Sequence, residues 1–122
     1  MPAPLAPLVD QLPDGVLCAA LPTPFAVGPV NCYLLPEPPV TLIDPGMYLP
    51  DSLRDLDELL HTAGLALRDV KLIVVTHGHP DHFGAAAHVA RESGAPIVVG
   101  RSEARKLCLD HHRIDTYRVV LD

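Results

Sequence analysis

The sequence predicts a single α/β domain, and three observations lead to this prediction. From residue 40 onward, short apolar runs alternate with stretches whose apolar residues recur at helical spacing, as in folds that layer strands and helices. The chain has 122 residues, of which 48% are hydrophobic and 20% charged, which suits one domain with one core. No apolar run approaches the roughly 20 residues that a membrane-spanning helix needs.

The N-terminal part is rich in proline, with ten of the 14 prolines among the first 40 residues. We expect residues 1–15 to be a proline-rich lead-in strand or loop, and residues 16–122 to form the domain. Proline and glycine bound three short apolar runs, which predict strands over residues 16–21, 30–35 and 40–43. The prolines between the first two runs exclude a helix there, because they remove donors and fix φ.

The second part of the chain predicts helices and buried strands in alternation. Leu53, Leu56 and Leu60 recur at helical spacing, with Asp51 or Ser52 as the predicted N-cap and Gly64 as the stop. The run Lys71–Thr76 is apolar without alternation, which predicts a strand covered on both faces. The elements expected after it are a helix over residues 81–93, a buried strand over 96–100, and a helix capped by Ser102 that runs through Leu109.

Charge and cysteine content exclude several classes of protein. The formal net charge of −6 argues against a protein that holds nucleic acid through a basic face. Residues 1–11 contain no Lys or Arg and are interrupted by prolines, which is not the pattern of a secretory signal. Cys18, Cys32 and Cys108 are scattered and odd in number, so we expect reduced, buried thiols in a cytoplasmic protein. The partner we expect is a small-molecule substrate, with neither nucleic acid nor a membrane as a partner.

A cluster of ionisable side chains follows the predicted strand that ends at Thr76. His77 and His79 are two residues apart, so in an extended segment their side chains leave on the same side. Asp81 and His82 fall in the first turn of the next helix and can face the same space. Three imidazoles and a carboxylate that converge need a partner, and a divalent cation satisfies them. Zinc suits this donor set, and iron or manganese are also compatible.

The run Thr76-His77-Gly78-His79-Pro80-Asp81-His82-Phe83-Gly84 resembles the T-H-x-H-x-D-H-x-G signature of the metallo-β-lactamase superfamily. Upstream, residues 31–35 and 41–46 resemble the N-x-Y-L and L-I-D-x-G strands of that family, in the same order. The resemblance covers residues 16 to about 110. It implies an αββα sandwich with a metal site at one edge, of which this chain carries the N-terminal half.

The resemblance also implies roles for individual residues. His77 and His79 would bind a first metal ion, Asp81 and His82 a second one, and Asp44 would orient ligands by hydrogen bonding. The family is mostly hydrolytic, and a metal ion that lowers the pKa of water to about 7 suits hydrolysis of an ester, thioester or related bond. Asp81 would additionally orient the attacking water. Within the superfamily, the sequence resembles glyoxalase-II-like and general metallo-hydrolases most, although Ala85 stands where glyoxalase II usually has glycine.

Two alternatives remain open at this point. In the first, the chain belongs to an iron-dependent oxidoreductase of the persulfide-dioxygenase type, because such proteins share the H-x-H-x-D-H motif. In the second, the chain is a non-catalytic metal-binding or interaction module. The resemblance further implies three ligands beyond His82. His111 and His112 are only weak candidates for them, since solvent-facing positions at a helix end explain these residues better. A half-sandwich exposes one sheet face, so we expect the chain to self-associate and complete the sandwich as a homo-oligomer.

Overall fold

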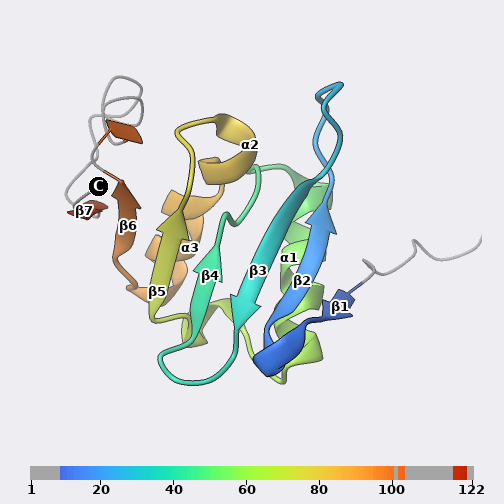
Figure 1. Ribbon diagram of the computed structural model, residues 1–122, viewed down its shortest axis with the longest axis vertical. Helices are drawn as coiled ribbons and strands as arrows, with labels where there is room; N and C mark the ends of the chain where they lie inside the picture. The colour runs from blue at the N-terminus through green and yellow to red at the C-terminus, as the bar shows by residue number, and fades with distance from the viewer. Residues whose placement is uncertain (1–8, 101, 104–116, 121–122) are drawn as a thin grey trace, which may run out of the picture.

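The computed structural model describes residues 9–100, 102–103 and 117–120. Their strands form one mixed sheet in which sequence order and spatial order are the same (Figure 1). The first four strands pair antiparallel, and the fourth to the seventh pair parallel. The strands are β1 (Val9–Gln11), β2 (Leu17–Leu21), β3 (Val30–Leu35), β4 (Thr41–Ile43), β5 (Leu72–Val75), β6 (Ile97–Gly100) and β7 (Tyr117–Val120).

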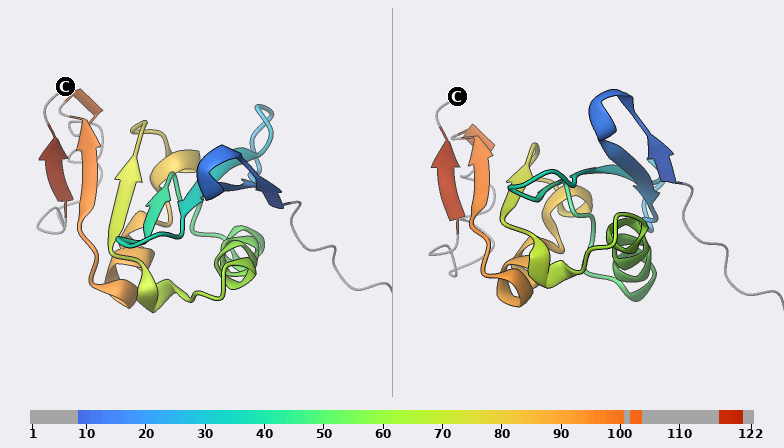
Figure 2. Two further views of the ribbon diagram at one scale, coloured as in Figure 1. Left: turned by 60° about the horizontal axis from the view of Figure 1, so that its bottom comes forward. Right: turned by 90° about the horizontal axis from the view of Figure 1, so that it is seen from below.

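The longer helices cover one face of this sheet. Helix α1 (Pro50–Thr62) packs against β2 and β3, and helix α3 (Ala86–Ser93) packs against β5 and β6. Both helices lie on the same side of the sheet (Figure 2). A short helix, α2 (Pro80–Phe83), follows β5, and 3-10 turns occupy Pro13–Gly15 and Leu67–Asp69. This sheet with one helical layer is the αβ half of the predicted αββα sandwich. No helix in the described ranges is long and apolar enough to cross a membrane.

The core lies between the sheet and its helical layer. Alternate strand residues point into it, because successive side chains of a strand face opposite sides. Its largest fully buried side chains are Leu21, Leu34, Leu42, Leu56, Leu59, Leu60, Ile73 and Ile97. On β5, Ile73 and Val75 are buried, whereas Leu72 and Val74 are only half-buried. The prediction that this strand is covered on both faces is therefore wrong for the described chain, which places helices on one face alone.

The predicted strands are found within one or two residues of their expected bounds, whereas the helix predicted over residues 81–93 is two helices. The helical hydrogen-bond pattern is interrupted between α2 and α3, at Gly84 and Ala85, although the φ and ψ of Ala85 stay in the right-handed helical region. The backbone N–H of Ala85 donates to the carbonyl of Gly46, at 2.8 Å, in place of the carbonyl four residues earlier. This contact ties the break to the segment after β4, and α3 then begins at Ala86.

The predicted N-cap of α1 is also wrong. The helix begins at Pro50, which suits a first helical position because its missing N–H would have no partner there. Leu49 is the N-cap residue and makes no side-chain capping bond. Ser52 lies inside the first turn, where it is buried. The predicted stop is confirmed, because α1 ends at Thr62 and Gly64 adopts a φ of 73°.

In the C-terminal region, the structure describes two residues of the predicted helix and one strand that was not predicted. Residues 102–103 are helical, and the remainder of the helix predicted through Leu109 lies outside the described residues. Strand β7 was not predicted, although its sequence, Tyr-Arg-Val-Val, contains the aromatic and β-branched residues that favour strands.

Candidate metal centre

The predicted site lies where the parallel strands end. Strands β4, β5 and β6 run in the same direction, so their carboxyl ends meet at one edge of the sheet. Asp44 directly follows β4, and residues 76–79 follow β5 and lead into α2 (Figure 1). Ligand sites in open α/β sheets concentrate at such edges, because the loops there are held by rigid strands.

Asp44 anchors the site. Its side chain is buried, and its backbone adopts a φ of 56°, a conformation that aspartate tolerates better than most residues. Its backbone N–H donates to the carbonyl of Val74, at 2.8 Å, which fixes the end of β4 against β5. Its carboxylate accepts the N–H of Thr76 on Oδ1, at 2.8 Å, and the Thr76 hydroxyl on Oδ2.

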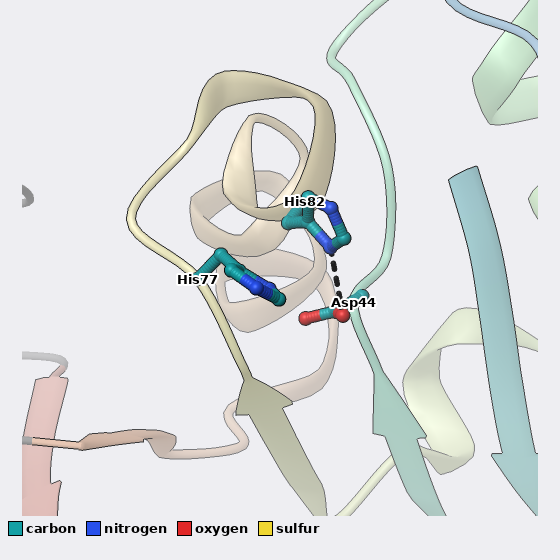
Figure 3. Close-up of side chains that lie close together, drawn as sticks. All are labelled: Asp44, His77 and His82. Carbon is teal, nitrogen blue, oxygen red and sulfur yellow. Dashed lines mark hydrogen bonds and ion pairs between the residues drawn. The ribbon is translucent and has the colours of Figure 1, made fainter. Parts of the chain in front are cut away.

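The same carboxylate orients His82. The Nδ1 atom of His82 lies 2.8 Å from Oδ2 of Asp44 (Figure 3). An ionised carboxylate can only accept hydrogen bonds, so Nδ1 of His82 carries the proton. In the neutral imidazole this leaves the lone pair of Nε2 free to bind a cation, as in carboxylate–histidine–metal arrangements.

Thr76 extends this orientation to His77. The Nδ1 atom of His77 lies 2.8 Å from Oγ1 of Thr76. Because the single hydroxyl proton of Thr76 is donated to Asp44, Oγ1 acts as the acceptor and Nδ1 of His77 as the donor. Asp44 thus sets the tautomer of both imidazoles, directly for His82 and through Thr76 for His77. The rings of His77 and His82 lie together, with centroids 4.6 Å apart.

The other two predicted ligands lie beside this pair. The rings of His77 and His79 are 6.0 Å apart and nearly parallel, at 25°, which confirms that the two side chains leave the chain on the same side. His79 is exposed and Asp81 is half-buried. The Oδ2 atom of Asp81 lies 3.8 Å from Nε2 of His82, the nitrogen that the Asp44 contact leaves free.

These distances fit a bound divalent cation. Two ligand atoms at about 2.1 Å from a zinc ion stand roughly 3–4 Å apart, which is the separation of the Asp81 and His82 atoms. A second grouping is also compact, because Asp44, His77 and His82 offer ligand atoms that all lie within 4.8 Å of one another. Both groupings contain His82, and both consist of the imidazole and carboxylate donors that zinc, iron and manganese accept.

A pocket of about 520 Å³ opens beside this cluster. Its lining combines the polar groups of the site with a mainly apolar wall from the β2–β3 connection, β3 and β4. The lining residues are Val27, Pro29, Val30, Asn31, Tyr33, Ile43, Asp44, Thr76, His77, Asp81 and His82. A small molecule could therefore contact both the ionisable cluster and an apolar surface.

Among the residues that the structure describes, the other histidines and the cysteines take no part in this cluster. His61 is exposed on α1, and His88 lies on α3 with its ring 5.2 Å from that of Tyr48. Cys32 is buried and Cys18 is half-buried, and burial raises the pKa of both thiols, with further increases from nearby acidic charge. His111, His112 and Cys108 lie outside the described residues.

Two contacts of the site were not predicted from the sequence. Thr76 belongs to the quoted motif, but its role as the link between Asp44 and His77 depends on the pairing of β4 with β5. The backbone N–H of Gly78 donates to Oε1 of Glu103, at 2.8 Å. Glu103 is 25 residues away in the sequence, and no local pattern marks it as part of the site.

Comparison with known proteins gives a consistent result. The sequence pattern of the metallo-beta-lactamase superfamily matches residues 26–121. The "Probable metallo-hydrolase YqjP" of Bacillus subtilis is 41% identical over 71 residues, which are 58% of this chain and 22% of the relative. A "UPF0173 metal-dependent hydrolase" of Rubrobacter xylanophilus is 44% identical over 57 residues, which are 47% of this chain and 21% of the relative.

Among solved structures, a metallo-beta-lactamase family protein of Thermus thermophilus superimposes with a TM-score of 0.70 at 31% identity. The match covers 78% of this chain and 31% of that one. The chain thus spans about a fifth of the length of the two curated relatives and about a third of the solved one.

Proposed function

Because the chain belongs to the metallo-beta-lactamase superfamily, we propose that its histidine-rich loop holds the metal centre of a metal-dependent hydrolase. His77 and His79 bind a first divalent cation, and Asp81 and His82 bind a second one. The hydrolase names of the two curated relatives support this class of reaction and do not favour an iron-dependent oxidoreductase.

One observation carries the proposal. The Asp44 network leaves Nε2 free on both His77 and His82, and Oδ2 of Asp81 lies 3.8 Å from Nε2 of His82. Neutral imidazoles and a carboxylate arranged with their lone pairs together repel one another unless a cation lies between them. Zinc is the cation we propose, and iron or manganese would use the same donors.

Asp44 has a different role in this proposal, although it belongs to a compact group with His77 and His82. Its Oδ2 atom already accepts from the Thr76 hydroxyl and from Nδ1 of His82, and its Oδ1 atom accepts from the Thr76 backbone. A carboxylate used in this way fixes the tautomer and direction of its partners. Asp44 is therefore a positioning residue, and the four residues of the loop are the ligands.

The chemistry follows from the groups at the edge of the pocket. A bound divalent cation would act as a Lewis acid that activates water and polarises a carbonyl or phosphoryl group. Asp81 accepts a hydrogen bond from the attacking water and orients it. The apolar wall formed by Val27, Pro29 and Ile43 holds the substrate, which we propose to be a small molecule with an ester or thioester bond.

Metal analysis of untagged protein tests the ligand assignment. We expect zinc to copurify with the chain, and we expect His79→Ala and Asp81→Ala to lower the metal content. His61→Ala removes an exposed histidine of α1 and serves as the matched control with unchanged metal content. If His79→Ala and Asp81→Ala keep the metal content of the parent protein, the assignment is wrong.

Activity measurements test the reaction class. Zinc-loaded protein is expected to hydrolyse a model aryl ester or an acyl thioester, with loss of activity in EDTA and recovery on adding zinc. Iron in the purified protein together with oxygen uptake on a persulfide would instead support an oxidoreductase. Bound metal without turnover of any of these substrates would identify the chain as a metal-binding module.

A further inference from the structure

The loop that carries the proposed metal ligands is held from three sides. Thr76 is tied to Asp44, which follows β4. The carbonyl of His79 accepts the N–H groups of His82 and Phe83, at 2.9 and 3.1 Å, so the loop is continuous with the first turn of α2. The third tie joins the N–H of Gly78 to Oε1 of Glu103, at 2.8 Å.

Glu103 reaches the loop because of the sheet topology. Strands β5 and β6 are parallel neighbours, with Val75 paired to Val99, so the segments that follow them leave the same edge of the sheet. Gly78 lies just past the end of β5 and Glu103 just past the end of β6. The three parallel strands β4, β5 and β6 therefore each place one residue of the support at this edge: Asp44, Thr76 and Glu103.

The hydrogen bond between Gly78 and Glu103 restrains the backbone between two of the proposed ligands. Gly78 stands between His77 and His79, so a rotation of the peptide group at Gly78 moves both imidazoles relative to each other. Its N–H is a buried donor in a loop that lacks the hydrogen bonds of a helix or sheet, and such a donor needs a partner. A carboxylate is the stronger acceptor for an N–H group, because hydrogen bonds to charged groups are shorter and stronger.

We propose that Glu103 is a positioning residue of the metal-binding loop, which holds the Gly78 peptide and thereby fixes His77 and His79 for one cation. This inference rests on the proposed function, in which these two histidines share a metal ion. Asp44 sets the direction of His77 and His82, and Glu103 sets the spacing between His77 and His79. The two acidic residues therefore support different parts of the same site.

Substitutions of Glu103 test the proposal in the full 122-residue chain. Zinc affinity is measured by competition with a chromogenic chelator, and ligand geometry by the visible absorption of the cobalt-substituted protein. We expect Glu103→Ala to weaken zinc binding by about 10- to 100-fold, as outer-shell substitutions typically do, and to change the cobalt spectrum. Glu103→Gln keeps an oxygen acceptor and is expected to retain affinity within about fivefold.

The control is Glu92→Ala, which removes an exposed acid of α3 and should leave affinity and spectrum unchanged. Thermal unfolding in EDTA shows whether each variant folds. If the alanine variant does not fold, Glu103→Leu replaces it, because leucine also lacks an acceptor but keeps more of the side-chain volume. Parental affinity in Glu103→Ala, or an equal loss in both Glu103 variants, would overturn a positioning role through this hydrogen bond.

A metal-independent measurement separates this proposal from the proposed function. Amide hydrogen exchange of Gly78 in metal-free protein is expected to be roughly tenfold faster or more in Glu103→Ala than in the parent, because the alanine variant lacks the acceptor. A parent chain that binds no zinc would refute the proposed metal centre, and the exchange rate would still report whether Glu103 holds the loop. An unchanged exchange rate at Gly78 would refute the hydrogen bond between Gly78 and Glu103.

Discussion

Asp44 combines three physical roles in one buried side chain. Its positive φ turns the chain away from β4, its N–H completes the pairing to β5, and its carboxylate accepts three hydrogen bonds. Asparagine also tolerates this backbone conformation, so Asp44→Asn changes the charge and one acceptor without straining the turn. The effect of the carboxylate can thus be separated from the effect of the turn.

We predict that Asp44→Asn destabilises the protein by about 1–3 kcal/mol, because an amide nitrogen replaces an acceptor and leaves a donor unpaired. We also predict lower metal content, because the tautomers of His77 and His82 are no longer fixed. Urea denaturation and metal analysis measure the two effects. Asp51→Asn is the control, since its ion pair with Arg54 is exposed and removing it should change stability by less than about 1 kcal/mol.

The two described cysteines should differ in reactivity. Thiolate is the reactive form, and burial raises the pKa of both thiols, so each has less thiolate at a given pH than a free cysteine. Cys32 is also fully enclosed, whereas Cys18 is half-buried. At about pH 8, near the pKa of a free thiol, we expect iodoacetamide to label Cys18 slowly and Cys32 only after unfolding, as resolved by peptide mass spectrometry. Rapid labelling of Cys32 in folded protein would contradict the packing around β3.

Residue patterns in the sequence predicted part of the site and missed part of it. The spacing of His77 and His79 predicts side chains on one side of the chain, because this depends only on the local backbone. The resemblance implied that Asp44 orients ligands, and the structure shows its contact with His82. The contact of Glu103 with Gly78 could not be predicted, because it depends on which strands are neighbours.

At the scale of elements, the break between α2 and α3 shows the same division between local and long-range causes. The apolar spacing of residues 81–93 predicts one helix, and helical residues occupy both ends of that range. The break is set by Gly46, whose carbonyl accepts the N–H of Ala85. The bounds of β2, β3, β4 and β6 were predicted more closely than this helix, because proline or glycine lies near their ends in the sequence.

Gly46 also lies close to side chains of β2 and α1. Its φ is 85°, and a Cβ atom there would lie 2.8 Å from Cδ1 of Leu21 and 2.8 Å from Oγ of Ser52. Gly64 has a similar φ of 73°, but a Cβ atom there would meet nothing within 4 Å. The two glycines therefore share the backbone requirement and differ in the space available.

We predict that Gly64→Ala costs about 1–2 kcal/mol, from the left-handed backbone alone. Gly46→Ala should cost a further 1–3 kcal/mol or so, because Leu21 is fully buried and cannot move away without disturbing the core. Urea denaturation of both variants measures the difference in the free energy of unfolding. If the free energy of unfolding falls by the same amount in the two variants, the close contacts at Gly46 do not contribute to the cost of the substitution.

At the scale of the whole molecule, the sheet has two unlike faces. The face under α1 and α3 contains the core, and among the described residues no helix covers the other face (Figure 2). Half-buried apolar side chains of Tyr33, Ile43, Leu72, Val74 and Val98 alternate with the core residues and so point to that other face. An apolar sheet face of this kind favours association.

We therefore propose that the 122-residue chain self-associates through this face. Light scattering at increasing concentration should show a mass above that of the 13.1 kDa monomer. Leu72→Lys and Val98→Lys place a charge on the face and should shift the chain toward the monomer. Thr62→Lys adds the same charge to the exposed surface of α1 and should not. A parent chain that stays monomeric at every concentration and melts cooperatively at high temperature would contradict this proposal. The sheet face would then be stable in contact with water, without a second copy of the chain.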